Sequence, residues 1–103
     1  MTLAFSEHPE AKDELKEAAR YYEVRQVGLG DDLLSCADSA VDDLLDSPDA
    51  WPPFPGWDAQ PLIRWHGIDR YPYRVVYYVK DVAVHIIAYA HISREPAYWR
   101  NRI

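Results

Sequence analysis

The chain has very little cysteine, since Cys36 is the only one in 103 residues. A single thiol excludes an internal disulfide and a cysteine-rich zinc site, because both need more than one sulfur. We interpret Cys36 as a small apolar residue buried on a helix. The chain also has no apolar run of the roughly 18 residues that a membrane-spanning helix needs. No membrane association is therefore expected.

The beginning of the chain, residues 1–7, has neither the basic region nor the long apolar region of a secretion signal. We therefore expect a cytoplasmic protein. A chain of 103 residues is long enough for one domain, residues 1–103, and too short for a core plus a cofactor-binding module. No cofactor is expected. The four histidines lack the spacing of a catalytic zinc site, so no metal is expected either.

The chain also lacks an excess of positive charge, since its formal net charge is −6. Residues 1–50 carry four Lys and Arg against thirteen Asp and Glu, a net charge of −9. Residues 51–103 carry seven against four, a net charge of +3. Non-specific affinity for nucleic acid comes from excess cationic charge, so this balance argues against general nucleic-acid binding. Any contact with RNA or DNA must be local, or be assisted by a larger complex.

The acidic half predicts a helical hairpin. A short strand at 2–5 comes first. Proline suits the first turn of a helix, and apolar residues then recur at helical spacing over 9–27. After a glycine-containing turn, Asp31 or Asp32 is expected to cap a second amphipathic helix that ends at Ser47. Both apolar stripes must be buried against another element.

A proline-rich connection follows at 48–61, where fixed φ angles and missing N–H donors forbid regular structure. It carries Trp51, Phe54 and Trp57. These aromatic residues form either a peptide-binding platform or plugs that pack the loop onto the core. We favour the plugs, because large aromatic side chains gain most from burial.

Three strands are expected after this connection, at 62–65, 73–79 and 82–90. Lys80-Asp81 is short enough for a two-residue hairpin loop, which would place Val79 opposite Val82. The predicted fold is α+β, with the N-terminal helical hairpin packed on one face of a small, mainly antiparallel sheet of three or four strands.

The alternation of side chains along these strands divides the sheet into two faces. The face expected to cover the helices carries Val75, Tyr77, Val79, Val82, Val84, Ile86, Ala88 and Ala90. The opposite face, expected to be open, carries Arg74, Val76, Tyr78, His85, Ile87, Tyr89 and His91. Arg64 and His66 share one parity and are expected to project onto this open face.

The last thirteen residues, 91–103, have the composition of a binding site. They hold one imidazole, three guanidinium groups, a phenol and an indole, all of which bind phosphates or stack on bases. The residues concerned are His91, Arg94, Tyr98, Trp99, Arg100 and Arg102.

Several short motifs occur in a fixed order along nearly the whole chain. They are Tyr21-Tyr22-Glu23, Gly28-Leu29-Gly30, Tyr73-Arg74-Val75-Val76-Tyr77, Ile86-Ile87-Ala88-Tyr89-Ala90-His91, and the ending with Arg94, Pro96, Tyr98-Trp99 and Arg102. This ordered set resembles the RelE/ParE toxins of type II toxin-antitoxin modules, or plasmid stabilization proteins. The resemblance implies a cognate antitoxin as partner and the α+β fold described above.

The resemblance implies two possible activities. RelE-like members cleave messenger RNA on the ribosome without a metal, whereas ParE-like members poison DNA gyrase. By position, Arg74 and Tyr98 match residues of the RelE-like site, and Arg64 and His66 stand near its two alternating lysines. Ile92 replaces the second catalytic arginine that is common in RelE-like chains. We therefore expect gyrase poisoning, with RelE-like cleavage and an inactive protein-binding module as alternatives.

The chemistry of RNA cleavage defines the candidate residues independently of the family. It needs a base for the 2′-hydroxyl, an acid for the leaving oxygen and cations around the phosphate. If the chain is a nuclease, the catalytic candidates are His91, Arg74, Arg94 and Tyr98. The binding candidates are Arg64, His66, Trp99 and Arg102.

Overall fold

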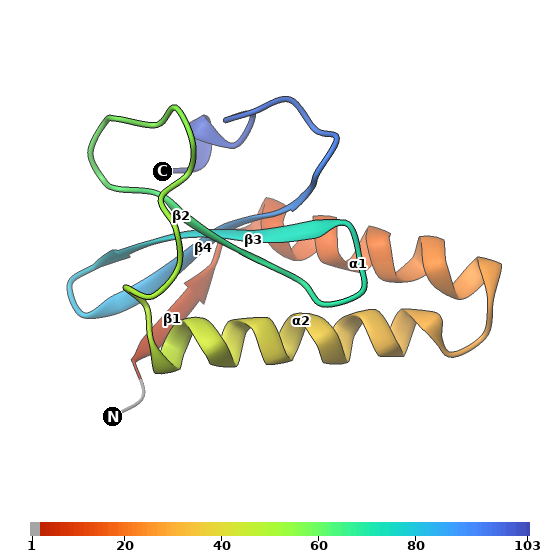
Figure 1. The fold of residues 1–103 in the computed structure, drawn as a ribbon. Coiled ribbons are helices and arrows are strands. Elements are labelled where there is room, and N and C mark those ends of the chain that lie inside the picture. The colour runs from red at the N-terminus through yellow and green to blue at the C-terminus, as the bar shows by residue number, and fades with distance from the viewer. Residues whose placement is uncertain (1–2) are drawn as a thin grey trace.

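The computed structural model of the protein describes residues 3–103. Seven elements follow one another along these residues (Figure 1). They are β1 (Ala4–Glu7), α1 (Pro9–Arg25), α2 (Leu29–Asp46), β2 (Arg64–Gly67), β3 (Tyr73–Lys80), β4 (Ala83–His91) and a short 3-10 helix (Arg100–Arg102). The strands form one sheet in the order β1-β4-β3-β2, in which β1 runs parallel to β4 and the other pairs are antiparallel.

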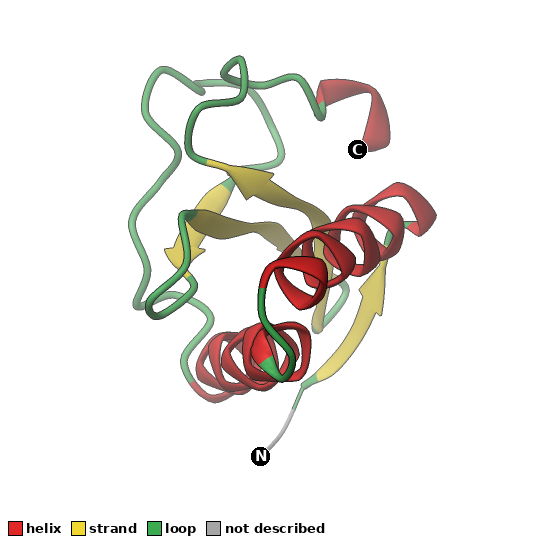
Figure 2. Ribbon diagram, turned by 90° about the vertical axis from the view of Figure 1, so that its right-hand side faces the viewer, coloured by secondary structure: helices red, strands yellow, loops and turns green. Residues whose placement is uncertain are grey.

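The two helices lie side by side against one face of the sheet (Figures 1 and 2). Apolar side chains of α1, α2, β3 and β4 form the main core between these layers. Cys36 belongs to it and is 9% exposed, as expected of a small apolar residue on a helix. The predicted α+β fold, a helical hairpin on a small, mainly antiparallel sheet, is confirmed.

The first helix begins where the sequence predicts and ends slightly earlier. Pro9 occupies its first position, and the Nδ1 atom of His8 accepts a hydrogen bond from the backbone N–H of Glu10 at 3.2 Å. The helix ends at Arg25, because Gln26 adopts an extended conformation with φ −158°. The predicted end at about Val27 was two residues too late.

The second helix is not capped by Asp31 or Asp32, so that prediction was wrong. It begins at Leu29 after Gly28, which adopts a left-handed conformation with φ 97°. The carboxylate of Glu23, near the end of α1, accepts the backbone N–H of Gly28 at 3.0 Å and that of Gly30 at 3.0 Å. A side chain from the preceding helix therefore supplies the cap, which local sequence rules do not anticipate. The two aspartates lie in the first turn instead, where the helix dipole favours them.

The first strand also differs from its prediction at 2–5. Thr2 lies outside the described residues, and β1 extends through Ser6 and Glu7. The extension follows from parallel pairing with β4, in which Ser6 lies opposite His85 and Glu7 opposite Ile86. A contact between residues 79 positions apart has thus lengthened a strand whose local sequence suggested an earlier end.

The hairpin between β3 and β4 turns at Asp81-Val82, and the predicted loop at Lys80-Asp81 was wrong by one residue. Lys80 pairs with Ala83. The two loop residues have φ 55° and 52°, as a two-residue turn of the type that matches strand twist requires. A valine at positive φ is unusual, so no local pattern marked this position as a turn.

A β-bulge lies in the middle of β4. Tyr77 pairs with Ile86, whereas the preceding residue of β3, Val76, pairs with Ala88. Ile87 is therefore an extra residue on β4. Because side chains alternate along a strand, one extra residue exchanges the two faces of everything that follows it.

The exchange corrects the predicted faces of the second half of β4. Tyr89 lies in the core beneath the helices, and His91 lies beside Tyr73 on the helix side. Ala88 and Ala90 lie on the far side. The prediction had placed each of these four β4 residues on the opposite face.

The face that points away from the helices is covered. A second core forms there from Ile63, Val76, Ile87, Ala88, Ala90 and Trp99. Phe54 and Trp57 of the proline-rich connection pack on the Trp99 ring, with ring centroids at 5.1 Å and 5.4 Å. The aromatic residues of this connection are thus plugs, as predicted, and these contacts fill the face that was expected to be open and cationic.

Candidate functional site

The C-terminal segment is anchored to α1 by one carboxylate, that of Glu14. Arg102 binds both of its oxygens, with N–O distances of 2.9 Å and 3.1 Å, and Tyr98 donates its hydroxyl at 2.6 Å. The backbone N–H of Tyr89 donates to the same carboxylate at 3.1 Å. Arg102 also donates to the carbonyl of Ile87. These contacts lie along the part of the β4 edge that is not paired with β1. Glu14 therefore links α1, β4 and the C-terminal segment, which are distant in sequence.

Tyr98 is engaged on its hydroxyl and on its ring. Burial and the hydrogen bond to Glu14 raise the pKa of its phenol far above the ordinary value, so it stays protonated at neutral pH. The guanidinium of Arg94 lies over the ring, 3.8 Å from its centroid. Arg94 itself is exposed to solvent. The pair therefore presents a cation at the surface, held in place by an aromatic ring.

The His91 ring is held by the residue two positions further on. Its Nδ1 atom accepts the backbone N–H of Ser93 at 3.0 Å and lies 2.7 Å from the Ser93 hydroxyl. An acceptor at Nδ1 carries no proton, so the neutral ring has its hydrogen on Nε2. The ring packs edge-on against Tyr73, with centroids 5.1 Å apart.

Arg74 lies on the far side of the sheet, over the ring of Trp65 at 4.5 Å from its centroid. The four catalytic candidates nevertheless meet at one place. Arg74, His91, Arg94 and Tyr98 all line a small depression of about 70 Å³ between the start of β3, the end of β4 and the loop that follows. The sequence therefore identified residues that the fold does bring together, although from both sides of the sheet.

Arg64 and His66 do not join this depression, and their predicted position on an open face was wrong. They lie opposite Tyr77 and Val75, which both face the helices. Arg64 donates to the carbonyl of Trp51 at 2.6 Å. His66 lies 3.0 Å from Asp43 of α2 and stacks on the Trp51 ring at 3.7 Å. The face of the sheet that Arg64 and His66 occupy depends on how β2 pairs with β3. Alternation within β2 alone shows only that the two residues share a face.

The two remaining candidates, Trp99 and Arg102, have structural contacts. The indole of Trp99 is 1% exposed, at the centre of the second core. Arg102 is bound by Glu14 and, through Nε, by Glu10 at 3.2 Å. Trp99 and Arg102 thus hold the end of the chain in place, although both were among the residues that first suggested a binding site.

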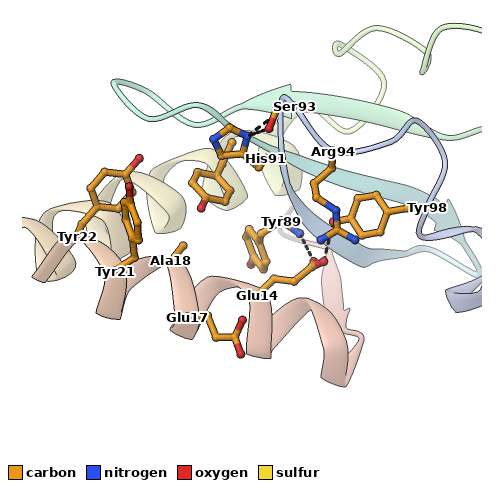
Figure 3. A pocket seen from close by; sticks show the side chains of 11 residues that line it. Glu14, Glu17, Ala18, Tyr21, Tyr22, Tyr89, His91, Ser93, Arg94 and Tyr98 are labelled. Carbon is orange, nitrogen blue, oxygen red and sulfur yellow. Dashed lines mark hydrogen bonds between the residues drawn. The ribbon is translucent and has the colours of Figure 1, made fainter. Parts of the chain in front are cut away.

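A larger pocket lies on the helix side, next to the depression, and sequence reasoning missed it. It has a volume of about 490 Å³ and opens between α1, the end of β4 and the following loop (Figure 3). We call it the tyrosine groove. It is lined by Glu14, Glu17, Ala18, Tyr21, Tyr22, Tyr73, Tyr89, His91, Ser93, Arg94 and Tyr98. The available signal was the spacing of Glu14, Glu17, Ala18, Tyr21 and Tyr22, which places them on one face of a helix.

A helical hairpin on a four-stranded sheet, closed by a C-terminal segment with three arginines, is the fold that the resemblance to the RelE/ParE toxins implied. A comparison with protein families matches residues 7–96 to the ParE toxin of type II toxin-antitoxin systems, parDE. The chain belongs to this family, because the match covers most of its length. This confirms the resemblance inferred from the sequence motifs. A search of curated proteins finds no match.

The side chains and helices of the described residues also bear on metal binding and membrane insertion. In the part of the chain that the structure describes, neither helix is long and apolar enough to span a membrane. Within residues 3–103, no group of three His, Cys, Asp or Glu side chains is arranged to hold a metal ion.

Proposed function

We propose that the chain is neutralised by a cognate antitoxin and inhibits growth by poisoning DNA gyrase. The internal hydrogen bond of the Tyr98 phenol carries this proposal. The hydroxyl of Tyr98 donates to the carboxylate of Glu14 within the chain, so its proton is not free for a substrate. General acid-base cleavage needs groups free to exchange protons with the substrate. A protein target, in contrast, can be held by shape and by aromatic surface.

The distribution of charge supports the same choice. Gripping RNA requires several free cations, because affinity for phosphates increases with the number of charges neutralised. Arg64 and Arg102 are engaged in internal contacts, and the net charge is −6. Among the candidate arginines, Arg74 and Arg94 keep their guanidinium groups near the surface depression, each stacked on an aromatic ring.

One observation favours RelE-like cleavage of messenger RNA as a second candidate. Arg74, His91, Arg94 and Tyr98 line the same depression, so two cations, an imidazole and a phenol are close together. The hydrogen bonds of the His91 ring involve Nδ1, so Nε2 is the ring atom that would exchange a proton. The two candidates therefore differ in whether His91 is needed.

A His91→Gln variant distinguishes these mechanisms. Glutamine preserves size and hydrogen bonding but cannot transfer protons near neutral pH. We expect the purified variant to inhibit gyrase supercoiling within about two-fold of the unmodified chain, because shape is retained. A Lys80→Gln variant, at the distant hairpin, serves as control. If ribosome-dependent messenger RNA cleavage is found instead, and falls by about a hundred-fold or more in His91→Gln, the gyrase proposal is wrong.

The antitoxin is tested by expression. We expect the chain alone to arrest growth, and co-expression with the neighbouring reading frame to restore growth and give a co-purifying complex. The expected dissociation constant is nanomolar or lower, about −12 kcal/mol or better. A chain that is harmless alone and purifies in high yield without a partner would contradict both parts of the proposal.

A further inference from the structure

A serine and a histidine form a pair near one edge of the sheet. Ser6 of β1 lies opposite His85 of β4 in the parallel pairing of these two strands (Figure 1). The Oγ atom of Ser6 and the Nδ1 atom of His85 are 3.0 Å apart, which is within hydrogen-bonding distance. Neither residue lines the tyrosine groove or the depression. The pair is therefore a separate cluster of a hydroxyl and an imidazole.

The pair lies on the face of the sheet that points away from the helices. Val84 and Ile86, the neighbours of His85 on β4, both belong to the main core beneath the helices. Because side chains alternate along a strand, His85 points to the opposite face. Its imidazole is half-buried, whereas Ser6 is exposed. A small molecule in solution can therefore reach the Ser6 hydroxyl.

Two further contacts fix the orientation of the His85 ring. Its Nε2 atom lies 3.3 Å from the backbone carbonyl oxygen of Lys80. The ring also stacks on that of Tyr78, with centroids 4.9 Å apart and an angle of 21° between the ring planes. A carbonyl oxygen only accepts hydrogen bonds, so the hydrogen of the neutral imidazole lies on Nε2. Nδ1 then carries no hydrogen and accepts the hydrogen bond of the Ser6 hydroxyl.

This arrangement has the three parts of an activated nucleophile. A serine hydroxyl reacts slowly unless an adjacent base takes its proton, and a third group must orient that base. Here the hydroxyl belongs to Ser6, the base is Nδ1 of His85, and the orienting group is the Lys80 carbonyl. The same carbonyl stabilises the ring after proton transfer, because a charged donor forms a stronger hydrogen bond.

We propose that Ser6 is a site of covalent acylation, which takes an acyl group from a small activated ester. The Ser6 oxygen attacks the carbonyl carbon of the ester, and its proton passes to Nδ1 of His85. The bond between the acyl carbon and the leaving oxygen then breaks, and the alcohol component departs as its anion. His85 releases its proton to solvent, which leaves an O-acyl serine. This reactivity is independent of whether the chain acts on gyrase.

Another serine-histidine pair, Ser93 with His91, has a less favourable arrangement. Nδ1 of His91 lies 2.7 Å from the Ser93 hydroxyl and also accepts the backbone N–H of Ser93 at 3.0 Å. That backbone N–H opposes protonation of Nδ1, because a protonated nitrogen no longer accepts a hydrogen bond. Ser93 should therefore react more slowly than Ser6, although both serines are exposed and next to an imidazole.

The test treats the folded full chain with p-nitrophenyl acetate and locates the acetyl group by mass spectrometry of peptides. We expect Ser6 to be acetylated at least about ten-fold faster than Ser93 and than Ser35, an exposed serine of α2. The three serines are compared in one sample, so the chain supplies its own control. Equal rates at Ser6 and Ser35 would overturn the proposal and leave the contact with His85 as a link between two strands.

Two variants identify the reacting groups. Ser6→Ala should abolish the fast release of about one equivalent of p-nitrophenolate per chain. His85→Gln retains a hydrogen-bonding side chain but cannot take a proton near neutral pH, so the Ser6 rate should fall about ten-fold or more, to that of Ser35. An undiminished Ser6 rate in a His85→Gln chain that is folded by circular dichroism would contradict the proposal. If this variant does not fold, the comparison of serines in the unmodified chain still decides.

Discussion

Replacing Glu14 by glutamine is expected to cost about 3 kcal/mol of unfolding free energy, because one substitution disturbs several buried contacts at once. The Glu14 carboxylate accepts from Tyr89, Tyr98 and Arg102. The side chains of Glu14 and Arg102 are 16% and 11% exposed. Little water can therefore reach the Arg102 guanidinium to replace its lost interaction with the carboxylate. Glutamine also puts an NH₂ group where one carboxylate oxygen had accepted two hydrogen bonds. Urea unfolding followed by circular dichroism measures the loss.

Glu17→Gln is the matched control for this change. It makes the same substitution on the same helix, three residues away, at an exposed side chain, and should change stability by less than about 0.5 kcal/mol. A second readout follows the C-terminal segment itself, because trypsin cleaves after arginine. We expect faster cleavage at Arg100 and Arg102 in Glu14→Gln only. Equal stability of both variants would show that Glu14 does not hold the segment.

Stability is also expected to fall steeply above pH 10. Burial raises the pKa of Tyr77 to about 12 from the ordinary 10.0, and the hydrogen bond to Asp32 raises that of Tyr71 to about 12. Burial likewise raises the pKa of Tyr73, Tyr89 and Tyr98. A phenol with a higher pKa in the folded chain releases its proton first in the unfolded chain. Its contribution to stability is therefore complete below pH 10 and is lost between about pH 10 and 12.

Urea midpoints measured from about pH 8 to 12, together with the ultraviolet absorbance of tyrosinate, test this expectation. Tyr77→Phe is the informative variant, because Tyr77 is fully buried and donates to the carbonyl of Pro48 at 2.5 Å. It should lower stability near pH 8 by about 1 kcal/mol and flatten the alkaline decline. An unchanged slope would show that Tyr77 does not contribute to it.

Much of the fold followed from local patterns. Pro9 marked the start of α1, the proline-rich connection came out irregular, and its aromatic residues proved to be plugs. These features depend on neighbours in sequence or on the general gain from burying large rings. The capping of α2 did not follow, because its acceptor, Glu23, comes from another helix.

The sequence anticipated that four of the candidate residues lie together, but not how they are arranged, and Arg64 and His66 lie elsewhere. Arg74, His91, Arg94 and Tyr98 do line one depression. The sequence did not indicate the contacts of these residues. Glu14, for example, lies 84 residues before Tyr98, to which it is hydrogen-bonded. Helical spacing groups Glu14 with Tyr21, but no local rule places that face opposite Tyr89 and His91.

The sequence by itself determined the elements, the family resemblance and the identity of the side chains near the C-terminus, because periodicity and motif order are properties of the chain. Only the tertiary structure decided which faces Ala88, Tyr89, Ala90 and His91 occupy. The reason is the single extra residue, Ile87, in β4: it exchanges the two faces beyond it and turns His91 from an expected open surface into the tyrosine groove. A bulge arises from the pairing of two strands, so neither strand alone encodes it.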